Sequence, residues 1–281
     1  MYLCPFLKGM KHSEIRHVIL IGAGNVATHL AYHLESSKLK LVQIWSRTES
    51  SARTLGEKVQ TPFTTSLDSI FPDADLYILA LPDHVLPKIL PELPLQRDRF
   101  IVHTAGGSDM DILATASDRY GVFYPLQTCT REHPVRFRSV PFCLEANTPG
   151  DLAMLKDFAH HFSSKIYVMD SEKRKTVHLA AVFANNFTNY LYQVSEDILL
   201  KENLPFKLLQ PLIRETAMKV QHYPPRSVQT GPAIRHDNAV LSEHLEHLGK
   251  DTKYGRLYSF LTQCILETYD NNSKPHDHGE L

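Results

Sequence analysis

Two hydrophobic patterns divide this chain near residue 170. In the first part, short apolar runs typical of buried strands alternate with segments of helical periodicity. Strands are expected at 18–21, 40–45, 75–81, 99–103, 121–124, 140–145 and 165–169, and helices at 51–58, 84–90, 109–117 and 151–162. Strands that alternate with helices predict a doubly wound, mostly parallel α/β sheet with right-handed crossovers.

Beyond residue 170 the strand pattern gives way to long helices. One apolar seam recurs at three-four spacing and comprises Val177, Ala180, Ala184, Phe187, Leu191, Val194 and Ile198. It predicts a helix from about 171 to 202, capped by Asp170 or Ser171. Because a helix of this length cannot bury its whole face inside a domain of ~100 residues, we expect it to pack across a two-fold homodimer interface.

The remaining helices are expected at 206–222, from residue 238, and at 254–269. The fold class is therefore α/β, with a doubly wound Rossmann sheet over 14–170 followed by an all-α domain over 171–270. Residues 1–13 are expected to form an N-terminal extension and residues 271–281 a disordered tail.

Composition narrows the function classes. The 281 residues carry a formal net charge of −1, so no global field attracts nucleic acid or an anionic membrane surface. No apolar run approaches the ~20 residues of a membrane span, and none resembles a signal segment. Four scattered cysteines without a C-x-x-C pair favour reduced thiols in the cytoplasm. The histidine clusters at 160–161 and 276–278 lack partners at ligand spacing, so no metal site is predicted.

The strand at 18–21 runs directly into a glycine-rich turn of the form G-x-G-x-x-A, Gly22-Ala23-Gly24-Asn25-Val26-Ala27. Gly22 permits a tight turn, and Gly24 lets the backbone approach a pyrophosphate. The N–H groups at the start of the following helix, around Asn25 and Val26, then face phosphate oxygens. Glycine turns are common, but the position of this one between a buried strand and a helix predicts a dinucleotide site.

The next strand ends in Ser46-Arg47-Thr48, at the position that decides between NAD and NADP. An NAD site carries an acidic residue here, which accepts hydrogen bonds from the ribose 2′-hydroxyl. Ser46 stands in its place, and Arg47 and Thr48 offer a guanidinium and a hydroxyl to a 2′-phosphate. We therefore predict NADP as the cofactor. The alternative is that Arg47 is an ordinary surface arginine.

Later strand ends supply further candidates, because ligands bind at the carboxyl ends of parallel strands. Leu81 and Pro82 are expected to border the cofactor ribose, and Thr104 the nicotinamide or the substrate. His103 is a candidate acid or base, and a structural role in the loop is equally open. Asp83 is expected to cap the helix that follows it.

A polar stripe runs along the long helix. His178, Asn185 and Asn189 lie nearly on one face, with Asn186 and Tyr190 beside them. Amides and an imidazole need hydrogen-bond partners when they are buried. They either face the cleft between the two domains, where a substrate would contact Asn185 and Tyr190, or bond to neighbouring helices.

Two loops carry arginines. The loop at 131–138 is expected to form a solvated rim, with a contact to the cofactor phosphates as the alternative. The loop at 229–237 contains Arg235, which suits a substrate carboxylate or phosphate because a guanidinium binds such groups bidentately. Asp237 is a candidate substrate-binding residue that orients His236 or Arg235, or it only caps the next helix.

Three segments of the first domain resemble the NADP domains of pyrroline-5-carboxylate reductase and of the deazaflavin-dependent NADP reductases, namely Gly22 to Ala27, Trp45 to Thr48 and Ala80 to Asp83. The helical half looks like the C-terminal domains of the 6-phosphogluconate and 3-hydroxyacid dehydrogenase superfamily. From about residue 14 to 268, the chain resembles a family that joins such a Rossmann domain to a helical domain of unknown function. The marks of that family are His103 to Gly106, Tyr124 to Thr128 and Thr230 to Asp237.

One departure limits what the resemblance implies. In the 3-hydroxyacid dehydrogenases, a catalytic lysine lies on the long helix three residues before an Asn-Asn pair. Asn185 and Asn186 match the pair, but Val182 stands in the place of the lysine, and His178 lies one turn earlier. The resemblance therefore implies the fold and the cofactor, but not the hydroxyacid chemistry.

The leading hypothesis is an NADP-dependent oxidoreductase that transfers a hydride to or from a small, anionic substrate in the interdomain cleft. Arg235 is expected to hold the anion, and His178 or His103 to exchange the proton. Asn185 or Asn186 is expected to orient the reacting atom. Two alternatives stay open: an NADP-binding regulatory or scaffold protein without turnover, which the missing lysine favours, and a Rossmann domain that binds S-adenosylmethionine.

Overall fold

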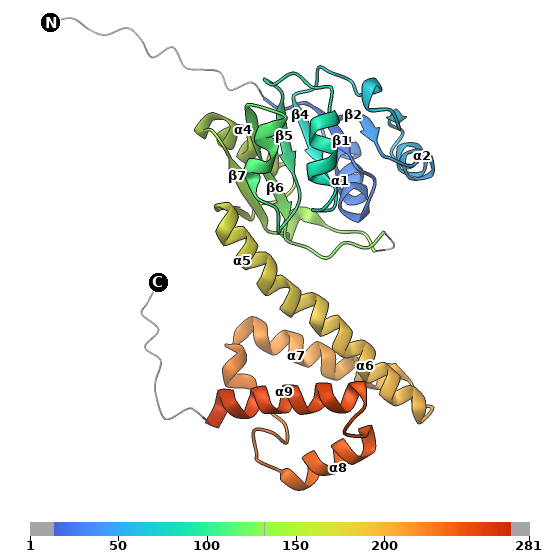
Figure 1. Ribbon diagram of the computed structural model, residues 1–281, viewed down its shortest axis with the longest axis vertical. Coiled ribbons are helices and arrows are strands. Elements are labelled where there is room, and N and C mark those ends of the chain that lie inside the picture. The colour runs from blue at the N-terminus through green and yellow to red at the C-terminus, as the bar shows by residue number, and fades with distance from the viewer. Residues whose placement is uncertain (1–13, 132, 271–281) are drawn as a thin grey trace, which may run out of the picture. The chain divides into compact units, whose positions relative to one another are not determined.

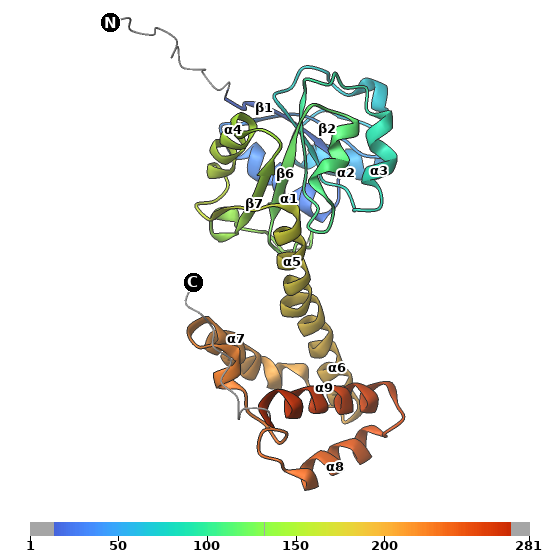
Figure 2. The ribbon, with the colours of Figure 1, turned by 60° about the vertical axis from the view of Figure 1, so that its left-hand side comes forward.

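The computed structural model describes residues 14–131 and 133–270. The expected N-terminal extension at 1–13, the tail at 271–281 and its histidine cluster lie outside the described residues. The chain forms two compact units that divide after Phe187, inside the long helix. Figures 1 and 2 label most of the strands and helices of the two units.

The first unit is built on a mostly parallel sheet, as the sequence predicts. Its described strands follow the order β3-β2-β1-β4-β5-β6-β7-β8, and only β6 and β7 pair antiparallel. They are β1 (His17–Ile21), β2 (Lys40–Trp45), β3 (Phe63–Thr64), β4 (Leu76–Leu79), β5 (Phe100–His103), β6 (Arg119–Pro125), β7 (Phe142–Ala146) and β8 (Ile166–Val168). The strand order reverses at β1, which lies between β2 and β4, so the carboxyl end of β1 is the place where a doubly wound sheet binds ligands.

Helices connect these strands, and two differ from the expected pattern. The α-helices are α1 (Asn25–Glu35), α2 (Glu49–Lys58), α3 (Leu86–Ile89) and α4 (Pro149–His160). The segment expected as a helix at 109–117 forms a 3-10 helix, Met110–Thr115. The capping role of Asp83 is wrong: α3 begins only at Leu86, because Pro87 suits the first helical turn, where its missing N–H costs nothing. The Asp83 carboxylate instead accepts a hydrogen bond from Ser108 Oγ at 2.7 Å.

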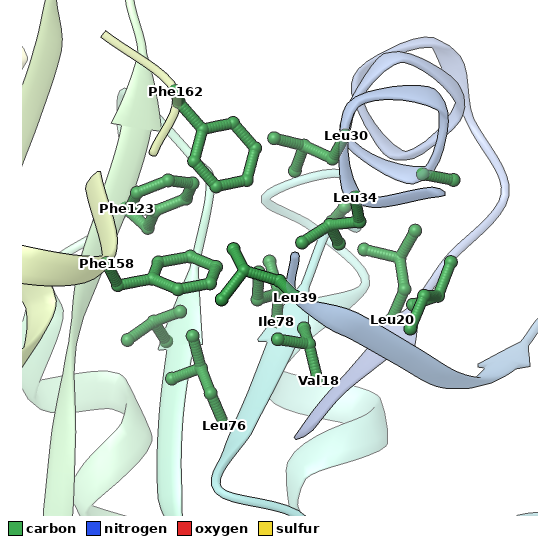
Figure 3. Packing of buried hydrophobic residues seen from close by; sticks show 14 of the residues in the cluster. Val18, Leu20, Leu30, Leu34, Leu39, Leu76, Ile78, Phe123, Phe158 and Phe162 are labelled. Carbon is green, nitrogen blue, oxygen red and sulfur yellow. The ribbon is translucent and has the colours of Figure 1, made fainter. Parts of the chain in front are cut away.

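The core of the first unit has a larger hydrophobic cluster on one face of the sheet and a smaller one on the other face, where a third, minor cluster holds Val122, Tyr124 and Cys143. Alternate residues of β1 belong to different clusters, with Val18 and Leu20 in the larger and Ile19 and Ile21 in the smaller. Figure 3 shows the larger cluster, in which the rings of Phe123, Phe158 and Phe162 face the leucines of α1. The ring centroids of Phe123 and Phe158 lie 5.2 Å apart. Burial on both faces explains why the strands appear in the sequence as continuous apolar runs.

The long helix predicted at 171–202 is helical throughout but changes its winding midway. It consists of α5 (Ser171–Ala181), a π-helical turn (Val182–Phe187) and α6 (Thr188–Lys201). Asp170 caps it as expected, because its side chain accepts a hydrogen bond from the backbone N–H of Lys173 at 2.8 Å. The division after Phe187 leaves α5 and the π-helical turn in the first unit.

The second unit is helical in all of its described residues. Besides α6 it contains α7 (Gln210–His222), α8 (Asn238–Leu248) and α9 (Lys253–Asp270), together with 3-10 turns at Phe206–Leu209 and Pro225–Val228. Asp237 caps α8 by accepting a hydrogen bond from the N–H of Val240 at 3.3 Å. Within the described ranges, no helix has the length and hydrophobicity that a membrane crossing demands.

The aromatic cluster contributes to the stability of the first unit. Phe158→Ala is expected to lower its free energy of unfolding by about 3–5 kcal/mol, because a buried ring is lost and a cavity remains. Phe71→Ala is the matched control, since that ring is 44% exposed; its effect should stay within about 0.5 kcal/mol. Urea unfolding followed by circular dichroism measures both, and equal losses in the two variants would contradict the assigned core.

Candidate functional site

The glycine turn after β1 is shaped by two different requirements. Gly22 has φ of +123°, and a Cβ there would lie 2.3 Å from the carbonyl oxygen of Ala80, so the fold itself requires glycine. Gly24 is different: a Cβ there would meet nothing within 4 Å. The space in front of Gly24 is therefore open.

The start of α1 leaves its backbone N–H groups available. Gly24 is the N-cap, so no side chain caps the helix, and its first turn holds no acidic residue. The unpaired N–H groups and the positive end of the helix dipole thus face the open side of the glycine turn. This is the arrangement that binds phosphate groups.

A cavity of about 340 Å³ adjoins the turn on the side of β2. Gly22, Ser46, Arg47 and Thr48 line it, so the residues that the sequence analysis proposes for a 2′-phosphate share one cavity. Arg47 is exposed, and no hydrogen bond or ion pair joins its guanidinium to another described residue. Its charge is therefore available to an anionic ligand.

Arg131 adds a second guanidinium, from the loop that the sequence analysis expected to form a solvated rim, with a contact to the cofactor phosphates as the alternative. Its Nη2 donates a hydrogen bond to the carbonyl oxygen of Ala23, at 2.9 Å, inside the glycine turn. It lines the same cavity as Arg47. The arginine-rich loop was the available signal, but the sequence gives no means of joining two residues that lie 108 positions apart.

A larger cavity of about 830 Å³ continues the groove on the other side of the turn. Gly24, Ala80, Leu81 and Pro82 line both cavities, so the two form one continuous groove along the carboxyl ends of the strands. The larger cavity brings together these predicted residues: Gly24, Asn25, Val26, Leu81, Pro82, Thr104, His178, Asn185 and Asn186. All of its lining residues belong to the first unit.

Two ionisable side chains meet in the larger cavity. The hydroxyl of Tyr124, at the end of β6, lies 3.0 Å from Nδ1 of His178 on α5. Burial is the main cause that raises the pKa of Tyr124 to about 12, so the phenol keeps its proton at neutral pH. It can donate to a neutral His178 ring or accept from the Nδ1–H of a protonated one.

The fit around His178 is close. A Cβ on Gly106 would lie 2.5 Å from Nδ1 of His178 and 2.9 Å from the Tyr124 ring, so the loop after β5 leaves no spare room beside the pair. The sequence analysis had Tyr124 only within a family motif and assigned it no role. Its position at the carboxyl end of a strand was the signal that could have identified it.

His103 lies away from solvent. It is fully buried, its Nδ1 accepts a hydrogen bond from the N–H of Ala105 at 3.1 Å, and its Nε2 donates to the carbonyl oxygen of Asp109 at 3.3 Å. Burial lowers the pKa of His103 to about 4, so the ring is neutral at pH 7. With both nitrogens engaged in the loop, these contacts favour the structural alternative over proton transfer.

Three predicted site residues belong to the second unit. The ring of Tyr190 lies 5.0 Å from the ammonium of Lys253, and Asp237 caps α8. Arg235 lies in the loop before that cap. Their predicted contacts with a substrate stay predictions.

Comparison with known proteins identifies the family. A family model described as NADP oxidoreductase, coenzyme F420-dependent, matches residues 17–107, and one described as a domain of unknown function, DUF2520, matches residues 140–265. A Bacteroides fragilis protein assigned as an NADP oxidoreductase is 43% identical, with 91% of this chain and 99% of that one covered and a TM-score of 0.86. The chain belongs to this NADP oxidoreductase family. Functionally curated proteins give no match.

Two more distant structures share the fold. A pyrroline-5-carboxylate reductase from Streptococcus pyogenes is 16% identical, with 90% of this chain and 97% of that one covered and a TM-score of 0.60. An imine reductase from Myxococcus stipitatus, in complex with NADP⁺, is 13% identical, with coverage of 90% and 94% and a TM-score of 0.64. These likenesses agree with the fold that the sequence resemblance implies.

An NADP oxidoreductase uses NADP(H), and the groove of the first unit fits this cofactor on its own evidence. The open space at Gly24 and the uncapped start of α1 suit a pyrophosphate, and the unpaired Arg47 suits a 2′-phosphate. An acidic residue, which would repel the 2′-phosphate, is absent from the described lining of that cavity.

Arg47 is expected to discriminate between the two dinucleotides. Arg47→Ala should raise the Kd for NADPH about 10- to 100-fold and leave the Kd for NADH unchanged, because a charge-assisted hydrogen bond contributes about 1.5–3 kcal/mol. Trp45, the single tryptophan of the chain, lines the same cavity, so quenching of its fluorescence measures binding. Arg16→Ala, on a side chain that is 71% exposed outside the groove, is the control. Equal weakening for NADPH and NADH would contradict the role of Arg47.

Proposed function

We propose that this NADP oxidoreductase transfers hydride between the nicotinamide and a small-molecule substrate in the larger cavity of the first unit. NADPH, when bound, supplies the hydride. Arg47, Ser46 and Thr48 hold the 2′-phosphate, and the start of α1, at Gly24 and Asn25, holds the pyrophosphate. Gly22 shapes the turn, and Val26, Leu81, Pro82 and Thr104 border the rest of the cofactor.

The observation that carries this proposal is the Tyr124–His178 hydrogen bond inside the groove. Reduction of a C=O or C=N bond adds one hydride to carbon and one proton to the oxygen or nitrogen. The protonated His178 ring donates that proton from Nε2, while its Nδ1–H donates to the Tyr124 hydroxyl oxygen and so fixes the ring. The ring is left neutral and takes a proton from solvent before the next turnover. His103 has no part in this scheme.

Asn185 and Asn186 lie in the π-helical turn and line the same cavity. We assign them to orienting the reacting oxygen or nitrogen, because an amide both donates and accepts hydrogen bonds. Val182 supplies no ammonium at the position where the resembling dehydrogenases carry lysine. In this proposal His178, one turn earlier, takes over the proton transfer.

The lining of the larger cavity gives little support for the predicted negative charge of the substrate. No lysine or arginine is among the described residues that line the larger cavity, and Asp83 is their only carboxylate. The predicted preference for an anion therefore depends on Arg235 of the second unit alone.

Removal of either member of the pair should abolish most turnover. His178→Ala is expected to lower kcat about 10²- to 10⁴-fold, because general acid catalysis contributes that range. Tyr124→Phe should lower kcat by a smaller factor. NADPH binding, measured by Trp45 fluorescence, should stay unchanged. NADPH oxidation at 340 nm with imines, keto acids and aldehydes measures the rate.

The second unit offers a matched control. His244 Nδ1 lies 2.8 Å from the Tyr258 hydroxyl, so it forms a similar histidine–tyrosine pair outside the groove. His244→Ala and Tyr258→Phe should keep kcat within a factor of two, as an order-of-magnitude bound on surface substitutions. Tight NADPH binding without turnover of any substrate in the panel would favour the regulatory alternative and overturn the proposal.

We further propose a cytoplasmic homodimer. Cys129, Cys143 and Cys264 are free thiols, which supports a reducing compartment. In the described part of the second unit, only Val194, Ala233 and Leu241 are buried apolar side chains, whereas many large apolar residues are exposed. A unit with so small a core gains stability when a second copy covers its apolar surface.

Leu208 and Leu212, exposed by 56% and 62%, test the dimer. The native chain is expected to sediment at twice its mass of 32.0 kDa. Leu208→Glu/Leu212→Glu should yield monomers, because two carboxylates in an apolar interface stay unpaired. Phe71→Glu, at an exposed ring of the first unit, is the control and should leave the mass unchanged. A monomeric native chain would contradict the proposal.

A further inference from the structure

The long helix carries a fully buried arginine four residues before His178. The side chain of Arg174 is 1% exposed, and its Nη1 lies 2.5 Å from Oε2 of Glu145 on β7. Residues four apart lie on the same face of a helix, so Arg174 and His178 face the same side of α5.

The Arg174–Glu145 pair is the centre of a network that joins three parts of the first unit. Glu145 accepts hydrogen bonds from the N–H of Ser171, at 3.0 Å, and from its hydroxyl, at 2.8 Å. Ser171 Oγ in turn accepts from the N–H of Met110 at 3.0 Å. Arg174 Nη2 donates to the carbonyl oxygen of Ser108. The strand β7, the loop after β5 and the first turn of α5 are thereby fixed to one another.

That loop also carries Gly106, the residue on which His178 rests with no room for a Cβ. A slide of α5 along the loop by a fraction of an ångström would change the 3.0 Å contact between His178 and Tyr124. The network thus fixes both sides of the contact on which proton transfer depends.

Stability alone is a weak reason for this network. Burying a guanidinium and a carboxylate is costly, and apolar residues of similar volume often serve stability equally well. The Nε of Arg174 is buried without a hydrogen-bond partner, which adds to that cost.

We infer that Arg174 and Glu145 are positioning residues, which hold α5 against the loop after β5 so that the His178 ring meets the Tyr124 hydroxyl. This inference rests on the proposed function of His178. Under this inference, Arg174 and Glu145 influence the reaction although neither residue lines the groove.

The test compares two ion pairs of the same unit. Arg174→Met, and Arg174→Met/Glu145→Gln to avoid an unpaired buried carboxylate, break the network. Arg119→Met and Arg119→Met/Asp151→Asn are the matched controls, because Arg119 Nη2 lies 2.5 Å from the buried Asp151 carboxylate, away from the groove. For each variant we would measure Tm, Kd for NADPH by Trp45 fluorescence, kcat, and the ¹⁵N chemical shift of His178 Nδ1.

The Arg174 variants are expected to lower kcat about 10- to 100-fold, because small misplacements of a catalytic group have effects of that size. Their His178 Nδ1 shift should move toward the value in Tyr124→Phe, and Kd for NADPH should stay within a factor of two. The Arg119 variants should lose comparable Tm while kcat and the Nδ1 shift remain native.

Two outcomes would overturn the inference. One is a native Nδ1 shift in the Arg174 variants. The other is that kcat falls in proportion to the loss of Tm, to the same degree in the Arg174 variants and in the Arg119 variants. Failure of the proposed function has a different signature, since either no substrate would turn over at all or His178→Ala would retain the native kcat. The Nδ1 shift still tests the positioning in that case, because it needs no substrate.

Discussion

The close approach of β1 and β4 at their carboxyl ends is the constraint on which the groove depends. The two strands pair in parallel. Gly22, the first residue after β1, lies so close to the carbonyl oxygen of Ala80 that any side chain would collide with it. The chain can turn there only with a positive φ and no Cβ. That turn brings the start of α1 to the edge of the sheet, and the cofactor groove follows from it.

The other residues of the groove lie on separate segments that follow different strands. Arg47 follows β2, Leu81 follows β4, and Tyr124 ends β6. Their side chains converge because parallel strands all finish at one edge. The helix α5 supplies His178, which meets Tyr124. The π-helical turn after it has a wider winding, a feature often found at functional sites, and it exposes Asn185 and Asn186.

The sequence was sufficient for the features that are local. Continuous apolar runs predicted the strands, because both faces of the sheet are buried, and the spacing of Gly22 and Gly24 predicted the tight turn after β1. It failed where a side chain depends on a distant segment. Arg131 and Ala23, Tyr124 and His178, and Asp83 and Ser108 are joined only by the fold. Nor does three-four spacing reveal a π-helical turn, so the predicted apolar seam was drawn with uniform winding across 182–187.

The uncapped first turn of α1 has a consequence for the lifetime of the protein. No side chain caps its N–H groups, so a bound phosphate adds hydrogen bonds that the fold alone does not supply. A ligand that binds only the folded form adds RT ln(1 + [L]/Kd) to its stability, about 2.7 kcal/mol at a hundredfold excess over Kd. We therefore expect the resistance of this unit to proteolysis to increase with the concentration of the dinucleotide that binds it.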